Sequence, residues 1–280
     1  MWFIYVILYI ILAVIFTQNY KIVTKTSKSD GTLTVLLQML AGLTALIISV
    51  LFKFTFPSDW KVYVLLLIAC VFYGISDRMN TTVRSGVEAS TFSIIKQLST
   101  VFMILAGLLF FKEPFVWKKI IGAALIIFSN ILIFYKKGNQ KLDKYVILGI
   151  LSNISFSIAL FLDVNISDNF NLGFYVASTL IVPAIFIIIA EKIKLSNVKK
   201  EFINGNKKAI IITSISWASM IIVQLKAYQI GDVTTVAPLC SLTVIGNVIV
   251  GHLFLKEKQN LLKKIIAAIL IIISVVLIKG

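Results

Sequence analysis

A single lysine, Lys96, interrupts the apolar stretch 89–111 of the chain. An ammonium group inside a hydrocarbon layer costs at least ~3 kcal/mol, so it should face water, an acidic partner or an anionic ligand. The alternative is that it extends to the nearer headgroups, roughly 10 Å away at ~1.5 Å per residue. Gln97 follows it, and Thr100 shares its helical face, unless the Thr100 hydroxyl bonds to its own helix. These residue types predict a site for an anionic group, with amide and hydroxyl hydrogen bonds beside the charge.

Further polar side chains lie within other apolar stretches at helical spacing. Asn153 and Ser157 are four residues apart and Trp217 and Gln224 are seven apart, so each pair shares one helical face. Packing or hydrogen bonding between helices is the plainer explanation for such residues. We expect a substrate site formed by Lys96, Gln97, Thr100, Asn153, Ser157, Trp217, Gln224, Ser241 and Asn247.

Pro238 lies near the start of the apolar stretch 233–255. A proline inside a helix leaves a backbone carbonyl one turn earlier without its hydrogen bond. Transporters tolerate such breaks where a helix lines a cavity. We therefore expect a helix break at Pro238, followed by cavity-lining polar residues. An ordinary kinked helix, with its small polar residues bonded to neighbouring helices, is the alternative.

Charged residues near the ends of two apolar stretches are candidates for gating or coupling. Asp77, Arg78, Arg84 and Glu88 flank the connection between the third and fourth stretches, where they would form either a gate of ion pairs or a solvated loop. Asp163 lies near the end of its stretch, at the level expected for a headgroup contact. At greater depth it would carry a proton or pair with Lys96. We assign all five acidic and basic residues to gating or coupling.

The sequence offers little for catalysis. Its one histidine, His252, has no second ligand at the spacing of a zinc site, and no phosphate-cradling loop is present. Cys70 and Cys240 lie in separate apolar stretches, where packing is their simplest role. An intramembrane enzyme would need paired carboxylates, a histidine cluster or a nucleophile with its base. We therefore expect no enzyme activity, no metal and no cofactor.

Composition places these residues in a membrane. Hydrophobic residues make up 59% of the chain and charged residues 14%, whereas a soluble domain needs more polar surface. A membrane-spanning helix needs about 20 apolar residues, so the shorter stretches should extend into flanking polar residues. The sequence predicts an all-α, multi-pass protein of the cell membrane, embedded in the lipid bilayer. Its ten transmembrane helices would be built on residues 2–17, 33–52, 63–75, 89–111, 116–135, 145–162, 170–190, 209–223, 233–255 and 261–278.

The net charge of +15 is distributed unevenly between the loops. Nineteen lysines and arginines fall on one side of the ten stretches and seven on the other, with Lys96 between them. Loops rich in lysine and arginine usually stay cytoplasmic, which would place both termini outside. Lysines in short loops meet lipid headgroups, and the chain lacks the ordered soluble surface of a nucleic-acid-binding face. We expect no nucleic-acid partner.

Two segments 145 residues apart repeat one pattern. Each begins with a glycine, runs through a long apolar stretch to a Lys-Glu pair and continues into a second apolar stretch. With five spans in each half, the second half must cross the bilayer in the opposite direction, as in inverted-repeat transporters. The sequence predicts two inverted five-helix repeats, residues 1–137 and 143–280. The matching residues are Gly86, Phe110-Phe111-Lys112-Glu113, Gly122 and Ser129, and Gly231, Phe254-Leu255-Lys256-Glu257, Ala267 and Ser274.

These matched residues resemble the drug/metabolite transporter superfamily, specifically its EamA-type members with ten helices. The segment 93–98 is also similar to the fourth helix of plastid-type sugar-phosphate translocators, in which a lysine helps to hold the substrate's phosphate. The second half has Ser241 at the position of Lys96, so an anion clamp would be one-sided. Thr100 and Val244 stand where the family often has proline, and relatives usually keep both termini in the cytoplasm. We expect Glu113 and Glu257 to pair with neighbouring lysines or to cap the turn, in a structural role.

The resemblance and the repeat together favour a secondary active transporter that works by alternating access. Its substrate would be a small polar metabolite, anionic or zwitterionic, such as an amino acid or a phosphorylated metabolite. A coupling proton or ion and a monomeric or homodimeric state are consistent with this class. A flippase of a lipid-linked intermediate is the alternative, and an intramembrane enzyme is the weakest candidate. A lateral apolar opening would distinguish the flippase from a carrier with a closed pocket.

Overall fold

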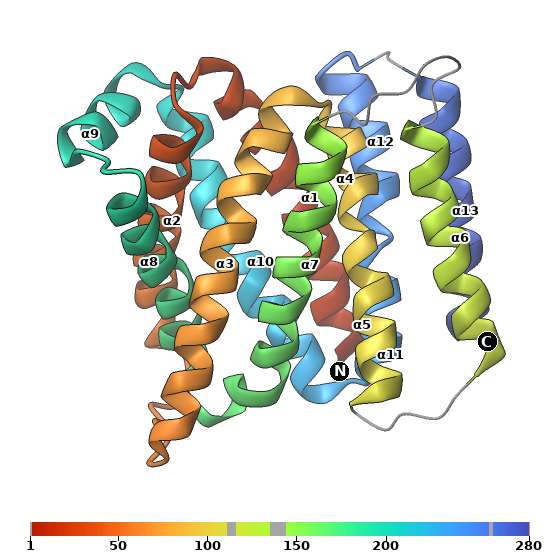
Figure 1. Ribbon diagram of the computed structural model, residues 1–280, viewed down its shortest axis with the longest axis horizontal. Coiled ribbons are helices and arrows are strands. Elements are labelled where there is room, and N and C mark those ends of the chain that lie inside the picture. Colours follow the sequence, from red (N-terminus) through yellow and green to blue (C-terminus); the bar gives the residue numbers. More distant parts are fainter. Residues whose placement is uncertain (1, 111–115, 135–143, 258–259, 280) are drawn as a thin grey trace.

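The computed structural model describes residues 2–110, 116–134, 144–257 and 260–279, and these residues form helices without strands (Figure 1). Eight of the described helical segments are long and apolar enough to cross a membrane, and a shorter apolar helix covers residues 120–132. The protein is thus an all-helical, multi-pass membrane protein. The repeated Lys112-Glu113 pair and the junction between the two predicted halves lie outside the described residues. The first five helices are α1 (Trp2–Thr26), α2 (Asp30–Ser49), α3 (Trp60–Gly86), α4 (Ala89–Lys96) and α5 (Leu98–Leu109).

Eight further helices complete the described part of the chain. A short helix, α9 (Leu195–Asn204), lies between the predicted spans 170–190 and 209–223, outside the bundle, and has no buried side chain. A short 3-10 turn, η1 (Ser167–Asn169), precedes α8. The helices are α6 (Trp117–Phe134), α7 (Lys144–Ile166), α8 (Leu172–Ala190), α9 (Leu195–Asn204), α10 (Lys207–Ile230), α11 (Val233–Cys240), α12 (Thr243–Phe254) and α13 (Leu261–Lys279).

Helices α1 and α3 are much longer than their apolar stretches. The stretch 2–17 becomes a helix that ends at Thr26, and the stretch 63–75 becomes a helix that ends at Gly86. The added turns carry polar side chains that are buried inside the bundle, among them Gln18, Tyr20 and Asn80. Hydropathy falls in these turns because they face a polar interior, although the helix itself continues.

The fourth and ninth predicted spans are each interrupted near their middle. Helix α4 gives way to α5 at Gln97, where i→i+3 hydrogen bonds replace the α-helical pattern. Helix α11 gives way to α12 at Ser241 and Leu242 in the same manner. The second interruption lies three residues after Pro238, close to the predicted break. The two interruptions meet, since the hydroxyls of Thr100 and Ser241 are 2.9 Å apart.

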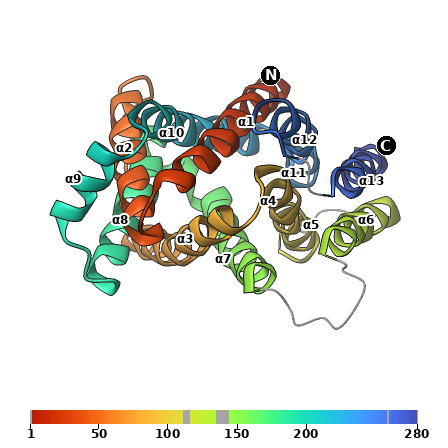
Figure 2. The ribbon, with the colours of Figure 1, turned by 90° about the horizontal axis from the view of Figure 1, so that it is seen from above.

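The long helices run alternately up and down in Figure 1. The α4–α5 unit descends, whereas α11–α12 ascends, and both ends of the chain lie at the lower edge (Figure 1). Seen from above, α6 and α13 form a pair at one side of the bundle, and α2 and α8 lie at the other (Figure 2). The core lies between these pairs, where α1 packs against α10 and α3 against α7.

Asn171 joins the lower ends of α2 and α8. Its buried amide donates to the backbone carbonyls of Ser49 at 2.9 Å and Phe52 at 3.1 Å, and its side-chain oxygen accepts from the N–H of Phe174 at 2.9 Å. It therefore caps the start of α8 and satisfies carbonyls at the end of α2. A Cβ added to Gly173 would lie 2.4 Å from the Ser49 backbone, so the helices meet closely here.

Replacing Asn171 with alanine should lower the free energy of unfolding by about 3 kcal/mol, because one cap is lost and buried carbonyls are left without donors. Asn206→Ala is the matched control, since Asn206 is exposed and its side chain caps only α10. That change should cost about 1 kcal/mol. Thermal and denaturant unfolding in detergent measure both. Equal losses in the two variants would contradict the role assigned to Asn171.

Candidate functional site

The bundle encloses a central cavity of about 110 Å³ between the two halves of the chain. Its walls come from α1, α3, α4, α5, α7, α8, α10, α11 and α12. Of the predicted substrate-site residues, seven line it: Lys96, Gln97, Thr100, Trp217, Gln224, Ser241 and Asn247. The structure therefore brings together residues that are up to 151 positions apart in the sequence (96 to 247).

Lys96 ends α4 at the interruption of the fourth span. Its Nζ is buried, has no hydrogen-bond acceptor among the described residues and lies 3.2 Å from the centroid of the Phe156 ring. The ring face stabilises the ammonium but cannot replace a hydrogen-bond acceptor. Gln97 donates to the backbone carbonyl of Ser93 at 2.9 Å and lines the cavity beside it. Lys96 therefore presents a charge that is free to bind an incoming acceptor.

The polar residues of the second half lie across the cavity. Asn247 donates to the Ser93 hydroxyl at 3.0 Å and accepts from the Gln18 amide at 2.9 Å, so it joins α12 to α4 and α1. Trp217 is buried, with its ring centroid 5.3 Å from that of Phe16 and 5.9 Å from that of Tyr20. These contacts hold the cavity walls in place.

Two of the predicted substrate-site residues and the predicted break lie away from the cavity lining. The Asn153 amide donates to the backbone carbonyls of Ile95 at 3.3 Å and Gly149 at 2.6 Å, and the Ser157 hydroxyl donates to its own helix at 2.7 Å. The amide nitrogen of Asn153 therefore attaches α7 to the end of α4. Pro238 lies inside α11, outside the residues that line the cavity.

The charged residues expected at the third-to-fourth connection do not form one loop. Asp77, Arg78 and Arg84 all lie in α3, and only Glu88 belongs to the connection, as the residue preceding α4. The expectation of a solvated loop fails because α3 extends eleven residues beyond the apolar stretch that ends at position 75. Asp77 and Arg84 line the cavity, whereas Arg78 does not.

Asp77 lines the same cavity as the two cations Lys96 and Arg84. Its Oδ2 accepts a hydrogen bond from the Gln38 amide at 2.9 Å. It attracts both Lys96 and Arg84 across the cavity, although it forms no ion pair with either among the described residues. The cavity therefore holds both positive and negative charge. The Nζ of Lys96 and the Nε and Nη1 of Arg84 have no hydrogen-bond acceptor among the described residues.

Asp163, which lies near the end of a predicted span, lines the cavity and is buried between helices. It is completely buried and accepts hydrogen bonds from the hydroxyls of Tyr73 at 2.5 Å and Tyr175 at 2.6 Å. Its partners are therefore phenols on α3 and α8, and no direct bond to Lys96 is formed. Two neutral donors stabilise the carboxylate while leaving it without a direct counter-ion among the described residues.

The upper edge of the bundle is held together by contacts between the two halves. Glu257 accepts from the backbone N–H groups of Ala89 at 2.6 Å and Ser90 at 3.1 Å, and thus caps α4 from the end of α12. Lys264 is 2% exposed; it pairs with Glu88 and lies 3.6 Å from Glu257. Of the expected gate residues, Glu88 thus belongs to a buried ion-pair cluster.

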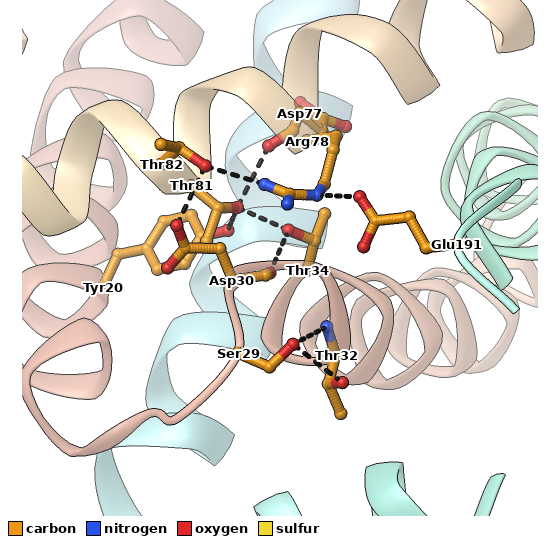
Figure 3. A network of polar contacts seen from close by, with 10 residues as sticks. All are labelled: Tyr20, Ser29, Asp30, Thr32, Thr34, Asp77, Arg78, Thr81, Thr82 and Glu191. Atoms are coloured by element: carbon orange, nitrogen blue, oxygen red, sulfur yellow. Dashed lines mark hydrogen bonds and ion pairs between the residues drawn. The ribbon is translucent and has the colours of Figure 1, made fainter. Parts of the chain in front are cut away.

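A second network closes the upper ends of α1, α2, α3 and α8 (Figure 3). Arg78 pairs with Glu191, at the end of α8, and donates to the Thr82 hydroxyl at 2.7 Å. Thr81 contacts the hydroxyls of Tyr20 at 2.7 Å and Thr34 at 2.6 Å. Arg78 therefore joins helices at their ends and does not face the cavity.

Sequence reasoning missed much of the aromatic and amide lining, including Tyr9, Phe16, Tyr20, Tyr73, Asn80 and Phe156. Tyr20 and Asn80 lie in the polar turns that extend α1 and α3 beyond their apolar stretches. A search for polar residues at helical spacing just past those stretches would have found them. Among the described residues, no group of three His, Cys, Asp or Glu side chains is placed to hold a metal ion.

Comparison with known proteins identifies a relationship over almost the whole chain. A model of the EamA-like transporter family matches twice, over residues 3–135 and 143–280. The fold is similar to that of a crystal structure titled only "Crystal structure of protein", with a TM-score of 0.66 and 13% sequence identity. The match covers 98% of this chain and 94% of the chain in that structure. At that identity, the likeness concerns the fold alone. No curated protein sequence matches.

Proposed function

Because the chain belongs to the EamA-like transporter family, we propose that it is a secondary active transporter of a small polar metabolite that alternates access between the two sides of the cell membrane. The substrate would be anionic or zwitterionic. The observation that carries this proposal is the buried Lys96 ammonium, which faces a polar cavity between the two halves without a hydrogen-bond acceptor among the described residues. A buried cation in a membrane protein that lacks an acceptor points to a ligand that supplies one.

Helix packing supports two inverted five-helix halves and ten spans in total. Counting α4–α5 and α11–α12 as single spans, the first span packs on the eighth and the third on the sixth, as α1 on α10 and α3 on α7. A two-fold axis between the halves converts one of these contacts into the other. The second–seventh, fourth–ninth and fifth–tenth contacts would each lie on that axis. The opposite directions of α4–α5 and α11–α12 agree with an axis in the membrane plane (Figure 1).

The same arrangement suggests how access would alternate. The ties of Glu257 and Lys264 to the start of α4 hold the upper edge closed. Rocking of one half against the other would break them and close the lower edge instead. Among the described residues, most lysines lie in the helix ends and loops at the upper edge, so this edge would be cytoplasmic, with both termini outside. A monomer already contains both halves of the cavity, and a homodimer would leave this mechanism unchanged.

A flippase of a lipid-linked intermediate is the alternative, since an apolar slot does open between α3 and α8. Its wall includes Val71, Ile75 and Phe186, and its rim includes Arg78 and Glu191. However, it shares no lining residue with the central cavity. A flippase needs a continuous lateral path for a headgroup, so the separate cavity favours a carrier.

Transport by purified protein in proteoliposomes tests the proposal. Amino acids, phosphosugars, nucleotides and quaternary amines would first be ranked by how far each raises the melting temperature. Each ligand that stabilises the protein would then be tested for exchange between the inside and outside of the vesicles. We expect saturable exchange of an anionic or zwitterionic metabolite. Non-saturating flux would indicate a channel, and movement of labelled lipid without metabolite exchange would indicate a flippase; either result would contradict the proposal.

A further inference from the structure

We propose that Arg84, placed by its sequence in a connecting segment, is a second anion anchor of the cavity, acting together with Lys96 on one oxyanion group of the ligand. The inference deepens the proposed function, because it concerns the ligand class of the same cavity. It assigns to that ligand a carboxylate or a phosphate that accepts hydrogen bonds from a guanidinium and an ammonium at once.

The first support is the burial of an incompletely satisfied guanidinium. Arg84 is 6% exposed and lines the central cavity from the last turns of α3. Its Nε and Nη1 atoms are buried and have no acceptor among the described residues. Burying a charge without acceptors costs free energy, so an arginine kept only for packing would be expected to bond a carbonyl or carboxylate. The free donors instead remain available to a ligand.

The second support is an aromatic enclosure that fixes the position of the charge. The Cζ atom of Arg84 lies 3.8 Å from the ring centroid of Phe92, 4.7 Å from that of Tyr20 and 4.8 Å from that of Phe16. Ring faces attract the guanidinium without using its N–H groups. The three rings come from α1 and α4, so the side chain is held between helices before any ligand arrives. Such a preorganised donor loses little conformational entropy when it binds.

The third support is the relation of Arg84 to the other charges. Lys96 and Arg84 line the same cavity and repel each other, and each is attracted by Asp77. Lys96 repeats the pattern of Arg84, with its Nζ against Phe156 and no acceptor among the described residues. The cavity lining holds two carboxylates, but Asp163 accepts hydrogen bonds from Tyr73 and Tyr175. Asp77 is therefore the carboxylate that attracts two cations that are both open to bonding. An oxyanion placed between them would satisfy both and reduce their repulsion.

Arginine geometry defines the class of ligand. The planar guanidinium presents parallel N–H groups that match two oxygens of a carboxylate or a phosphate, whereas an ammonium acts as a point donor. The aromatic and apolar wall beside it, including Phe92 and Trp217, suits a small organic body attached to that oxyanion. A neutral metabolite could accept hydrogen bonds from Arg84 but would not balance its charge, and a purely cationic one would be repelled by it.

Binding in detergent tests the inference without requiring transport. The probes are inorganic phosphate and succinate, with chloride at equal ionic strength as reference and glycine betaine as a zwitterion of similar size. Calorimetric titration and thermal shifts would be measured for the wild type, Arg84→Gln, Arg84→Lys and Arg78→Gln. Arg78→Gln is the matched control because it lies on the same helix, bonds Glu191 and does not line the cavity. Loss of a charged hydrogen-bond pair should weaken oxyanion binding by about 10- to 100-fold in Arg84→Gln.

Arg84→Lys keeps the charge but not the paired donors, so it should recover part of the affinity. This partial rescue distinguishes a ligand contact from a packing role, which would lower the melting temperature of both variants without changing the affinity. Stronger binding of phosphate than of succinate, or the reverse, would identify the oxyanion. The inference is overturned if the wild type binds neither probe better than chloride, or if Arg84→Gln binds as tightly as Arg78→Gln. Oxyanion binding without flux in vesicles would count against the proposed transport alone.

Discussion

Replacing Lys96 with glutamine is expected to lower the transport efficiency, kcat/KM, for an anionic substrate about 10- to 100-fold. Lys96 has a buried ammonium that faces the cavity without an acceptor among the described residues. A hydrogen bond between two charged groups in such a place contributes about 1.5–3 kcal/mol, and ~1.4 kcal/mol corresponds to a factor of ten. Glutamine retains a donor but loses the charge, whereas Lys96→Ala should lose both. Initial uptake rates in proteoliposomes measure the effect.

Lys226→Gln is the matched control, because it makes the same chemical change on α10. Lys226 donates to Gln229 at 3.1 Å and does not line the cavity. Substrate uptake by the Lys226→Gln variant should remain within about twofold of the wild type, as expected of a substitution outside the cavity. If Lys96→Gln and Lys96→Ala transport like Lys226→Gln, the ammonium does not bind substrate and the proposed anion site is wrong.

Replacing Lys264 with methionine should lower the free energy of unfolding by about 3–5 kcal/mol. Lys264 is 2% exposed and joins α13 to Glu88 and Glu257, so its removal takes a cation away from Glu257, whose side chain is 5% exposed. The same contacts tie the halves together at the upper edge. The variant should therefore also expose that edge, and a cysteine introduced at Ser90 should react faster with an impermeant thiol reagent.

An exposed ion pair provides the comparison. Arg78 and Glu191 pair across helices, but their side chains are 31% and 35% exposed, so Arg78→Gln should cost less than about 1 kcal/mol. Adding Glu257→Gln to Lys264→Met should recover part of the loss, because the 5% exposed carboxylate that has lost this cation is removed. Equal losses for Arg78→Gln and Lys264→Met, or no recovery in the double variant, would contradict the role of the buried cluster.

The helical membrane fold could be predicted from hydropathy, but the true lengths of its helices could not. Apolar runs identify where a helix meets lipid, and α3 meets lipid over only part of its length. Its last turns face the bundle interior, where Asn80, Thr81 and Arg84 are buried. Hydropathy assigns those turns to a connection because it cannot distinguish a polar interior from water. For this reason the sequence places Arg84 in a connection, although it lies in the last turns of α3.

The sequence alone predicted a site residue where its type is unusual for its surroundings. It did not predict roles that depend on contacts between helices. Lys96 was found because an ammonium in an apolar stretch requires a reason. Asp163 lies near the end of its span in the sequence, yet it is buried between Tyr73 and Tyr175 from two other helices. Asn153 has the residue type and spacing of a binding residue but bonds the α4 backbone. Such outcomes depend on how helices are rotated against each other, which a single sequence does not specify.

In the proposed carrier, the two interrupted spans that meet at the cavity are not equivalent. Thr100 and Ser241 touch at the junction, whereas Lys96 has only Ser241 as its sequence counterpart in the other half. Two otherwise interchangeable halves would give inward- and outward-facing forms of equal energy. An ammonium present in one half alone makes the two mouths of the pocket unequal. Affinity measured from one face of a vesicle should therefore differ from affinity measured from the other, even with no voltage or gradient applied.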